Sequence, residues 1–403
     1  MQILIKLFKI AFLTINLLLL FSSCDDNIKI QITEYNLKDY VYSDSAVFLN
    51  DIALDIDYIK LETSDSSYIG DIHQLDKDGS DLFILDRHYK ITHFNDKGCF
   101  VNTIGQIGEG PGEFLEPIAF ALFPKKEIIA VYDVAKKKII LFNYTADYIS
   151  EFRISVFALK IENLADSLIT VAIPFPEIVS NNNYGVSIFN LEGDLTDRVI
   201  NRKKEVSNRH FDSNSPIEGR QFLKKAGDKV KYWEMGNDTV YSISLNGKVE
   251  REYLICNSTQ DKSNSSGDIV ENSIWYGKIL DTDSYLFISP CILNNEVKSL
   301  MVNKSEGNGY NIMVHNNLNK SLQLQSGIIN NIDGGWPINP INITSSGDIY
   351  TTFFGHELIT QLETGLFDNQ EILNPSKRLE LDSLLSISGI YDNPIIMLVS
   401  LNK

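Results

Sequence analysis

Residues 89–98 read YKITHFNDKG, and the fold can be inferred from this unit. A run of β-branched and aromatic residues ends in Phe94, a turn of Asn, Asp and Gly follows, and Phe100 begins another run. Short runs of this kind, bounded by turn residues, are typical of β-strands joined in hairpins. The stretch therefore predicts two antiparallel strands.

The same unit recurs three times further along the chain. A strand and a turn return around Phe142, Phe189 and Ile243, at intervals of roughly 48, 47 and 54 residues counted from Phe94. This period is typical of one four-stranded propeller blade. At about 50 to 55 residues per blade, the chain from Ile69 onward holds six blades, with seven as the alternative. We therefore expect an all-β fold, a six-bladed β-propeller of four-stranded antiparallel blades.

The propeller domain is expected to occupy residues 53–403, after a tether and first strand region at residues 24–52. The last two blades are less regular and are expected within residues 285–314 and 336–360. Helical periodicity is nearly absent. Further short segments with strand composition lie at residues 82–85, 128–132, 167–171 and 348–353.

Two long connections interrupt the repeat, at residues 201–230 and 257–272. The first is rich in Arg and Lys, including Lys224 and Lys225, and the second in Ser, Asn and Asp. We interpret both as surface loops. Long loops on a rigid scaffold often carry binding residues, and the alternative is that they are solvated loops without a function.

The N-terminus has the order of an export signal. Lys6 and Lys9 precede an apolar run at residues 10–21, and two serines precede Cys24. An uncleaved membrane helix is the alternative, but the apolar run is short and interrupted by polar residues. The segment resembles the bacterial lipoprotein signal, which implies that residues 1–23 are removed and that Cys24 carries the acyl groups.

The acidic pair Asp25 and Asp26 follows the predicted lipid attachment site directly. It resembles the acidic patch that directs lipoproteins of the Bacteroidota to the outer face of the outer membrane. The alternative is that the two aspartates only begin a solvated tether. We therefore expect an outer membrane lipoprotein, either displayed on the cell surface or facing the periplasm.

Composition excludes nucleic acid as a partner. The chain has 53 acidic and 36 basic side chains and a net charge of −17, and removal of the signal subtracts two lysines. A nucleic acid requires a cationic surface that displaces its counterions, and no stretch here offsets the overall negative charge. The only membrane contact we expect is through the lipid anchor.

Cysteine usage indicates neither a disulfide framework nor a zinc site. With Cys24 lipidated, Cys99, Cys256 and Cys291 remain, an odd number with wide and unmatched spacing. Free cysteine is one of the most buried residue types, so we expect each of these to be a small apolar core residue.

A glycine-rich stretch runs from Gly105 to Phe114. Glycines let backbone amides approach an anion, but no Lys-Ser or Lys-Thr follows and no helical pattern begins there, as a phosphate-binding loop would require. We expect sharp bends between the outer strand of one blade and the inner strand of the next.

The histidines form no close pair at metal-ligand spacing. A propeller can still gather residues from distant blades around its central channel. His73, Asp133 and His356 lie near apparent inner strands of three blades, so they are the candidates for such a cluster. The identity of any metal is left unknown.

The chain offers no nucleophile elbow and therefore no local support for serine hydrolase chemistry. Trp233, Trp275 and Trp336 can stack on sugar rings where exposed, and core packing is the alternative. Trp336 is the candidate ligand-binding residue, because a Gly-Gly-Trp-Pro turn is expected at the surface.

Several motifs, taken in order and spacing, resemble the six-bladed β-propeller lipoproteins of the Bacteroidota, relatives of NHL-repeat proteins. These motifs lie at residues 57–63, 69–70, 82–86, 105–114, 236–241 and 332–337. The resemblance implies the propeller fold and carries no catalytic residue with it.

Two functions follow as expectations. The first is a lipid-anchored, non-enzymatic module at the cell envelope that binds a protein, peptide or glycan and needs no cofactor. The alternative is a metal-dependent hydrolase or lyase with calcium or zinc in the central channel, like the NHL-type propeller enzymes.

The lipid anchor predicts a specific mature N-terminus. Mass spectrometry of the purified protein should find a chain that begins at Cys24 and carries the mass of acyl groups, whereas Cys24→Ala should remain unprocessed and unacylated. An unmodified wild-type chain that begins at another residue would contradict the prediction.

Overall fold

The computed structural model describes residues 32–43, 46–174, 183–201, 221–256, 274–293, 296–312, 327–365 and 371–402. The predicted signal peptide, Cys24 and most of the two long connections lie outside the described residues. The architecture below is that of the unit Glu34–Lys403.

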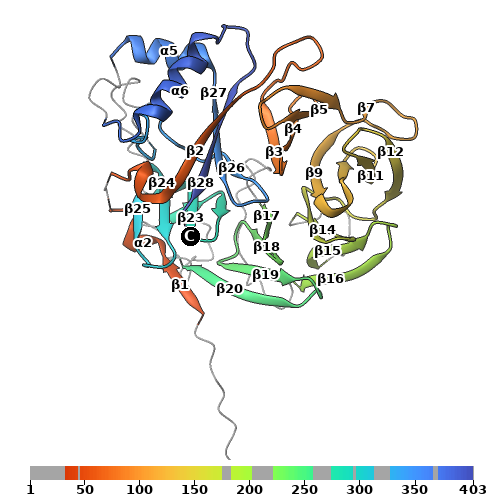
Figure 1. Ribbon diagram of the computed structural model, residues 1–403. Coiled ribbons are helices and arrows are strands. Elements are labelled where there is room, and N and C mark those ends of the chain that lie inside the picture. The colour runs from red at the N-terminus through yellow and green to blue at the C-terminus, as the bar shows by residue number, and fades with distance from the viewer. Residues whose placement is uncertain are drawn as a thin grey trace, which may run out of the picture. The chain divides into compact units, whose positions relative to one another are not determined.

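This unit is a six-bladed β-propeller, as the repeat predicts (Figure 1). The blades succeed one another along the chain, and within each blade neighbouring strands pair antiparallel. Blade 1 contains β3 (Ile72–Asp78), β4 (Asp81–Asp86), β5 (Ile91–Asn95) and β6 (Phe100–Thr103). Blade 2 contains β9 (Pro117–Phe123), β10 (Ile128–Asp133), β11 (Lys138–Asn143) and β12 (Tyr148–Arg153). Blade 3 contains β13 (Lys160–Ala165), β14 (Leu168–Ala172), β15 (Tyr184–Asn190) and β16 (Leu195–Asn201).

Blades 4 and 5 are larger sheets. Blade 4 contains β17 (Gln221–Ala226), β18 (Lys229–Glu234), β19 (Thr239–Ser244) and β20 (Val249–Cys256), with β1 (Thr33–Asn36) at its edge. Blade 5 contains β21 (Ile274–Tyr276), β22 (Ile279–Asp281), β23 (Tyr285–Leu293), β24 (Glu296–Asn303) and β25 (Gly309–Asn311). Both β21 and β22 pair with β23, so the first strand of this blade is interrupted.

Blade 6 closes the ring with strands from both ends of the chain. It contains β26 (Asn342–Ile343), β27 (Ile349–Phe353), β28 (Ile395–Leu401) and, as its outer strand, β2 (Ala53–Lys60). Ile56 of β2 pairs with Val399 of β28, and Ile59 pairs with Ile396. Figure 1 shows the orange-red β2 beside the blue β28.

The helices lie in the connections between strands. The short α2 (Leu37–Tyr40) and α3 (Leu49–Ile52) precede β2, and η1 (Pro124–Lys126) joins β9 to β10. The longer α5 (Gly355–Glu363) and α6 (Pro375–Ser386) are inserted between β27 and β28. Among the described residues, no helix is long and apolar enough to cross a membrane.

The first strands of the blades line the centre of the ring. Contacts join β3 to β9, β9 to β13, β13 to β17 and β22 to β26. Apolar side chains fill the space between blades, as where Phe83 of blade 1 packs with Phe120 and Phe142 of blade 2. Strands such as β4 are buried on both faces, so their sequences are continuous apolar runs rather than alternating ones. Leu82–Leu85 of β4 is buried throughout.

Most predicted strands are confirmed. The anchors Phe94, Phe142, Phe189 and Ile243 all lie on third strands, namely β5, β11, β15 and β19. The four further segments of strand composition fall within β4, β10, β14 and β27, apart from one flanking residue at 167 and one at 348.

Three expectations are wrong. Residues 221–230, predicted as part of a loop, form β17 and the start of β18. Residues 355–360, predicted within a blade, belong to α5, which together with α6 separates two paired strands. Cys99 is exposed in a turn and Cys256 is half-buried, so only Cys291 is the expected core cysteine, and burial raises the pKa of its thiol to about 12.

The glycine-rich stretch joins β6 to β9 and forms the expected bend. It contains the short parallel pair β7 (Gln106–Ile107) and β8 (Glu113–Phe114). The Glu113 carboxylate accepts hydrogen bonds from the Gly110 N–H at 2.7 Å and from Gln106 Nε2 at 2.6 Å. Gly105 has a φ of +63°, and a Cβ there would lie 2.6 Å from the Phe114 ring. The chain's own carboxylate therefore occupies the place that an anion would take.

Ring closure by β2 predicts the cost of truncating its inward face. Ile56→Ala should lower the free energy of unfolding by about 2–5 kcal/mol, because Ile56 is completely buried and its loss leaves a cavity. Leu54→Ala, on the same strand but 70% exposed, should change it by less than about 0.5 kcal/mol. Urea denaturation measures both values, and equal losses would contradict the role of β2.

Candidate ligand site in the central channel

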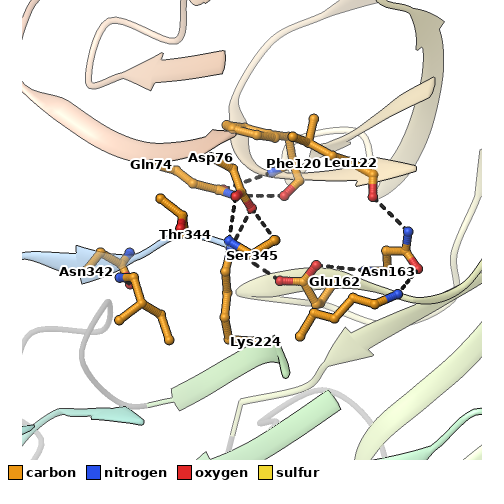
Figure 2. Close-up of polar contacts among 12 residues, drawn as sticks. Gln74, Asp76, Phe120, Leu122, Glu162, Asn163, Lys224, Asn342, Thr344 and Ser345 are labelled. Atoms are coloured by element: carbon orange, nitrogen blue, oxygen red, sulfur yellow. Dashed lines mark hydrogen bonds and ion pairs between the residues drawn. The ribbon is translucent and has the colours of Figure 1, made fainter. Parts of the chain in front are cut away.

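A buried ion-pair cluster lies where the first strands meet. Asp76 of β3, Glu162 of β13 and Lys224 of β17 contribute its charged groups (Figure 2). Lys224 Nζ lies 2.5 Å from Asp76 Oδ2 and 3.4 Å from Glu162 Oε2. The three side chains are 9%, 1% and 4% exposed for Lys224, Asp76 and Glu162. Three blades therefore share one ammonium group at the centre of the ring, and we call these residues the channel triad.

A fourth blade joins the cluster through Ser345, which follows β26. The Ser345 N–H donates to Asp76 Oδ1 at 2.7 Å, and its hydroxyl donates to Asp76 Oδ2 at 2.6 Å. The Lys77 N–H also donates to Asp76 Oδ1, at 2.9 Å. Asp76 thus has four donors including Lys224, so its negative charge is well compensated.

Neighbouring side chains tie the first strands to one another. Gln74 of β3 donates to the Phe120 carbonyl at 2.7 Å and accepts from the Phe120 N–H at 3.0 Å. Asn163 of β13 donates to the Leu122 carbonyl at 2.8 Å and accepts from Lys225 Nζ at 3.0 Å. Figure 2 shows these contacts on either side of the channel triad. The polar groups are therefore held on rigid strands rather than on loops.

The electrostatics of the channel triad are unequal. Burial lowers the pKa of Lys224, but the two carboxylates outweigh it and raise that pKa above its ordinary value. Burial and the negative charge of Asp76 raise the pKa of Glu162, against the opposing effect of Lys224. Since two carboxylates share one ammonium and Lys224 lies closer to Asp76, Glu162 holds a proton at a higher pH than an ordinary glutamate does.

A polar pocket lies beside Glu162 and Lys224 of the channel triad. Its cavity volume is about 40 Å³, and first strands of five blades line it. Glu162 and Lys224 belong to its wall, as do His73 of β3, Phe222 of β17 and Asn342 of β26. The pocket therefore offers charged groups, hydrogen-bond donors and acceptors, and one aromatic side chain.

The three residues proposed for a channel metal cluster do not come together. His73 lines the pocket, where its Nε2 lies 2.9 Å from the Ile118 carbonyl oxygen. Asp133 ends β10, and its carboxylate accepts N–H groups of the flanking turns, including that of Leu115 at 3.0 Å. His356 lies on α5. No group of three or more His, Cys, Asp or Glu residues that could hold a metal occurs among the described residues.

Trp336 is partly buried. Its ring stacks on Phe353, with ring centroids 5.7 Å apart and an interplanar angle of 12°. The turn that precedes it is held by the buried Asp333, which accepts from the Gly335 N–H at 2.8 Å and from the Tyr58 hydroxyl at 2.7 Å. The role of Trp336 in ligand binding stays a prediction. Trp233 is fully buried, as the packing alternative has it, and the side chain of Trp275 on β21 lies outside the described part of the structure.

The channel triad was missed for a definite reason. Lys224 and Lys225 were grouped with the cations of a predicted loop, and Asp76 and Glu162 carry no local motif. One signal was present, because Gly227 and Asp228 separate two runs of six residues as a hairpin turn would. A lysine at the middle of such a strand indicates either a solvated face or a buried partner.

Six antiparallel blades around a polar channel define the protein as a six-bladed β-propeller. More particularly, the chain belongs to the family described as a domain of unknown function, DUF4934, which matches residues 32–400.

Three solved structures are similar to this chain to different degrees. A Bacteroides fragilis protein whose name presumes that it is exported has 21% identity and a TM-score of 0.66, over 92% of this chain and 100% of that one. A DUF4221 family member from Bacteroides vulgatus has 12% identity and a TM-score of 0.46, over 87% and 97%. Virginiamycin B lyase from Staphylococcus aureus has 11% identity and a TM-score of 0.41, over 73% and 80%. No curated protein matches the chain.

The channel triad predicts a large difference between two adjacent lysines. Lys224→Met should lower the free energy of unfolding by about 3–5 kcal/mol, because it leaves two buried carboxylates without their ammonium. Lys225→Met, which loses one hydrogen bond to Asn163, should cost about 1 kcal/mol. Urea denaturation compares the two, and a smaller loss for Lys224→Met would contradict the structural role of the cluster.

Proposed function

We propose that the protein is a lipid-anchored propeller of the cell envelope that binds a polar ligand, a glycan or a peptide, in its central pocket. The observation that carries the proposal is the pocket itself, whose walls are first strands of five blades and include Glu162 and Lys224 of the channel triad. Small-molecule sites are typically concave, preformed and supplied with a few fixed polar groups.

The placement of the polar groups supports a role in ligand binding and not only in folding. A propeller needs apolar contacts between its blades, as in the cluster around Phe83 and Phe142, and does not need charged ones. Burying a carboxylate and an ammonium costs free energy that well-packed apolar residues would not. Glu162 and Lys224 carry that cost beside an opening, where a ligand can reach them.

The cellular location rests on the sequence features around Cys24. The order of basic, apolar and small residues before the cysteine supports export and lipidation, and Asp25 and Asp26 support display on the outer face of the outer membrane. The name of the Bacteroides fragilis relative agrees with export. The kinship with NHL-type propellers is part of the same proposal.

Only the binding function is proposed, because no described residue favours the metal-dependent hydrolase or lyase. Trp336 is retained as a possible second contact for a sugar ring, since part of its surface is exposed and its ring is fixed by Phe353.

Filling the pocket tests the function directly. On a glycan and peptide array, His73→Trp should abolish the signals of the wild-type chain, because a larger ring occupies the pocket while its N–H still offers a donor to the Ile118 carbonyl. His88→Trp, at an exposed position outside the pocket, should leave them unchanged.

Melting temperatures of both variants check that the fold is intact. Signals that survive His73→Trp would contradict binding in this pocket. Signals that instead disappear with Trp336→Ala would move the site to the Trp336 turn.

A further inference from the structure

We infer that the ligand presents a positively charged nitrogen, as an ammonium or guanidinium group, to Glu162 in the pocket. This inference rests on the proposed function and names the class of ligand that the pocket selects.

The first step is the charge balance of the channel triad. Asp76 and Glu162 carry two carboxylates, and Lys224 supplies one ammonium between them. Asp76 takes the shorter contact and three further donors from Lys77 and Ser345. Glu162 has the longer, 3.4 Å contact to that ammonium and accepts hydrogen bonds from the backbone N–H groups of Asn163, at 3.0 Å, and of Lys225. One negative charge is thus incompletely neutralised, and it lies on the residue that reaches the pocket wall.

The surrounding charges do not remove this imbalance. Lys224 and Asp76 are the charged groups that act most strongly on Glu162. Lys225 on β17 donates to Asn163, and His73 on β3 contacts the Ile118 carbonyl. Lys160, two residues before Glu162 on the same strand, is half-buried at the pocket wall. Tyr350 on β27 is neutral, with burial raising its pKa above the ordinary value.

The carboxyl of Glu162 binds a proton more readily than an ordinary glutamate does. Burial and the like charge of Asp76 raise the pKa of Glu162, so its carboxyl holds a proton at a higher pH than an ordinary glutamate. A cationic ligand replaces that proton with its own charge and forms a charge-assisted hydrogen bond. An anionic ligand would instead place its negative charge beside Glu162, and a neutral polyol would gain nothing from the ionised form.

The pH dependence follows with a definite sign. As the pH rises through the raised pKa of Glu162, the carboxyl loses its proton and affinity for a cation increases. Affinity falls again only where the ligand amine itself loses its proton. A neutral ligand that hydrogen-bonds to either form shows a much smaller change.

The test uses amine-bearing saccharides and lysine-containing peptides, each printed on an array as the free amine and as its N-acetylated form. The wild-type chain should prefer the free amines by roughly 10- to 100-fold, the value of one charge-assisted hydrogen bond. Glu162→Gln keeps the shape of the side chain and should abolish this preference and its pH dependence. Glu151→Gln, which removes an equal charge outside the pocket, should preserve both.

The outcomes separate this inference from the proposed function. Equal or stronger binding of the acetylated forms, in signals that His73→Trp abolishes, would overturn the cation preference and leave the pocket as the binding site. The absence of any signal sensitive to His73→Trp would overturn both. Melting temperatures of the two Gln variants establish that each is folded.

Discussion

The ion pair between Lys224 and Asp76 sets the arrangement at the centre of the protein. It joins strands that are 148 residues apart in the sequence, and Glu162 and Ser345 connect two further blades to it. A buried pair contributes little net stability compared with apolar packing, yet it is costly to break. The contacts of Lys224 and Asp76 form only when the first strands of blades 1, 3, 4 and 6 lie at the same level along the channel. The pair therefore acts mainly by specifying one arrangement among several that apolar packing alone would allow.

Closure of the ring is the second constraint, and polar contacts fasten it as well. Beyond the pairing of β2 with β28, Asn393 bridges the start of blade 1. Its side chain accepts from the Ile69 N–H at 2.8 Å and donates to the carbonyls of Glu62 at 2.7 Å and Ser67 at 2.9 Å. These residues lie more than 320 positions apart along the chain. Such contacts form only after the intervening blades are in place, so they stabilise the completed ring rather than its parts.

The fold was predictable because its signals are local. Phe94 and its counterparts are each followed by a turn, and the period between them measures the blade directly. The channel triad has no such local signal, since Asp76, Glu162 and Lys224 come together only when the ring forms. No residue next to them in the sequence indicates which partner each one has. The sequence did not predict α6 because this helix buries only Leu381 and Leu385, so its helical periodicity is weak.

The fold has local sequence signals, whereas the site forms only in the completed ring. This difference explains why the family can be recognised while its ligand is unknown. Apolar contacts between blades preserve the propeller whatever its centre contains, so the fold alone assigns no function. The centre carries buried charges that the fold does not require, and their arrangement is unequal: Asp76 is fully bonded, whereas Glu162 shares its cation and borders the pocket. The selectivity of the pocket therefore resides in Glu162, the residue at which a ligand supplies what the protein lacks.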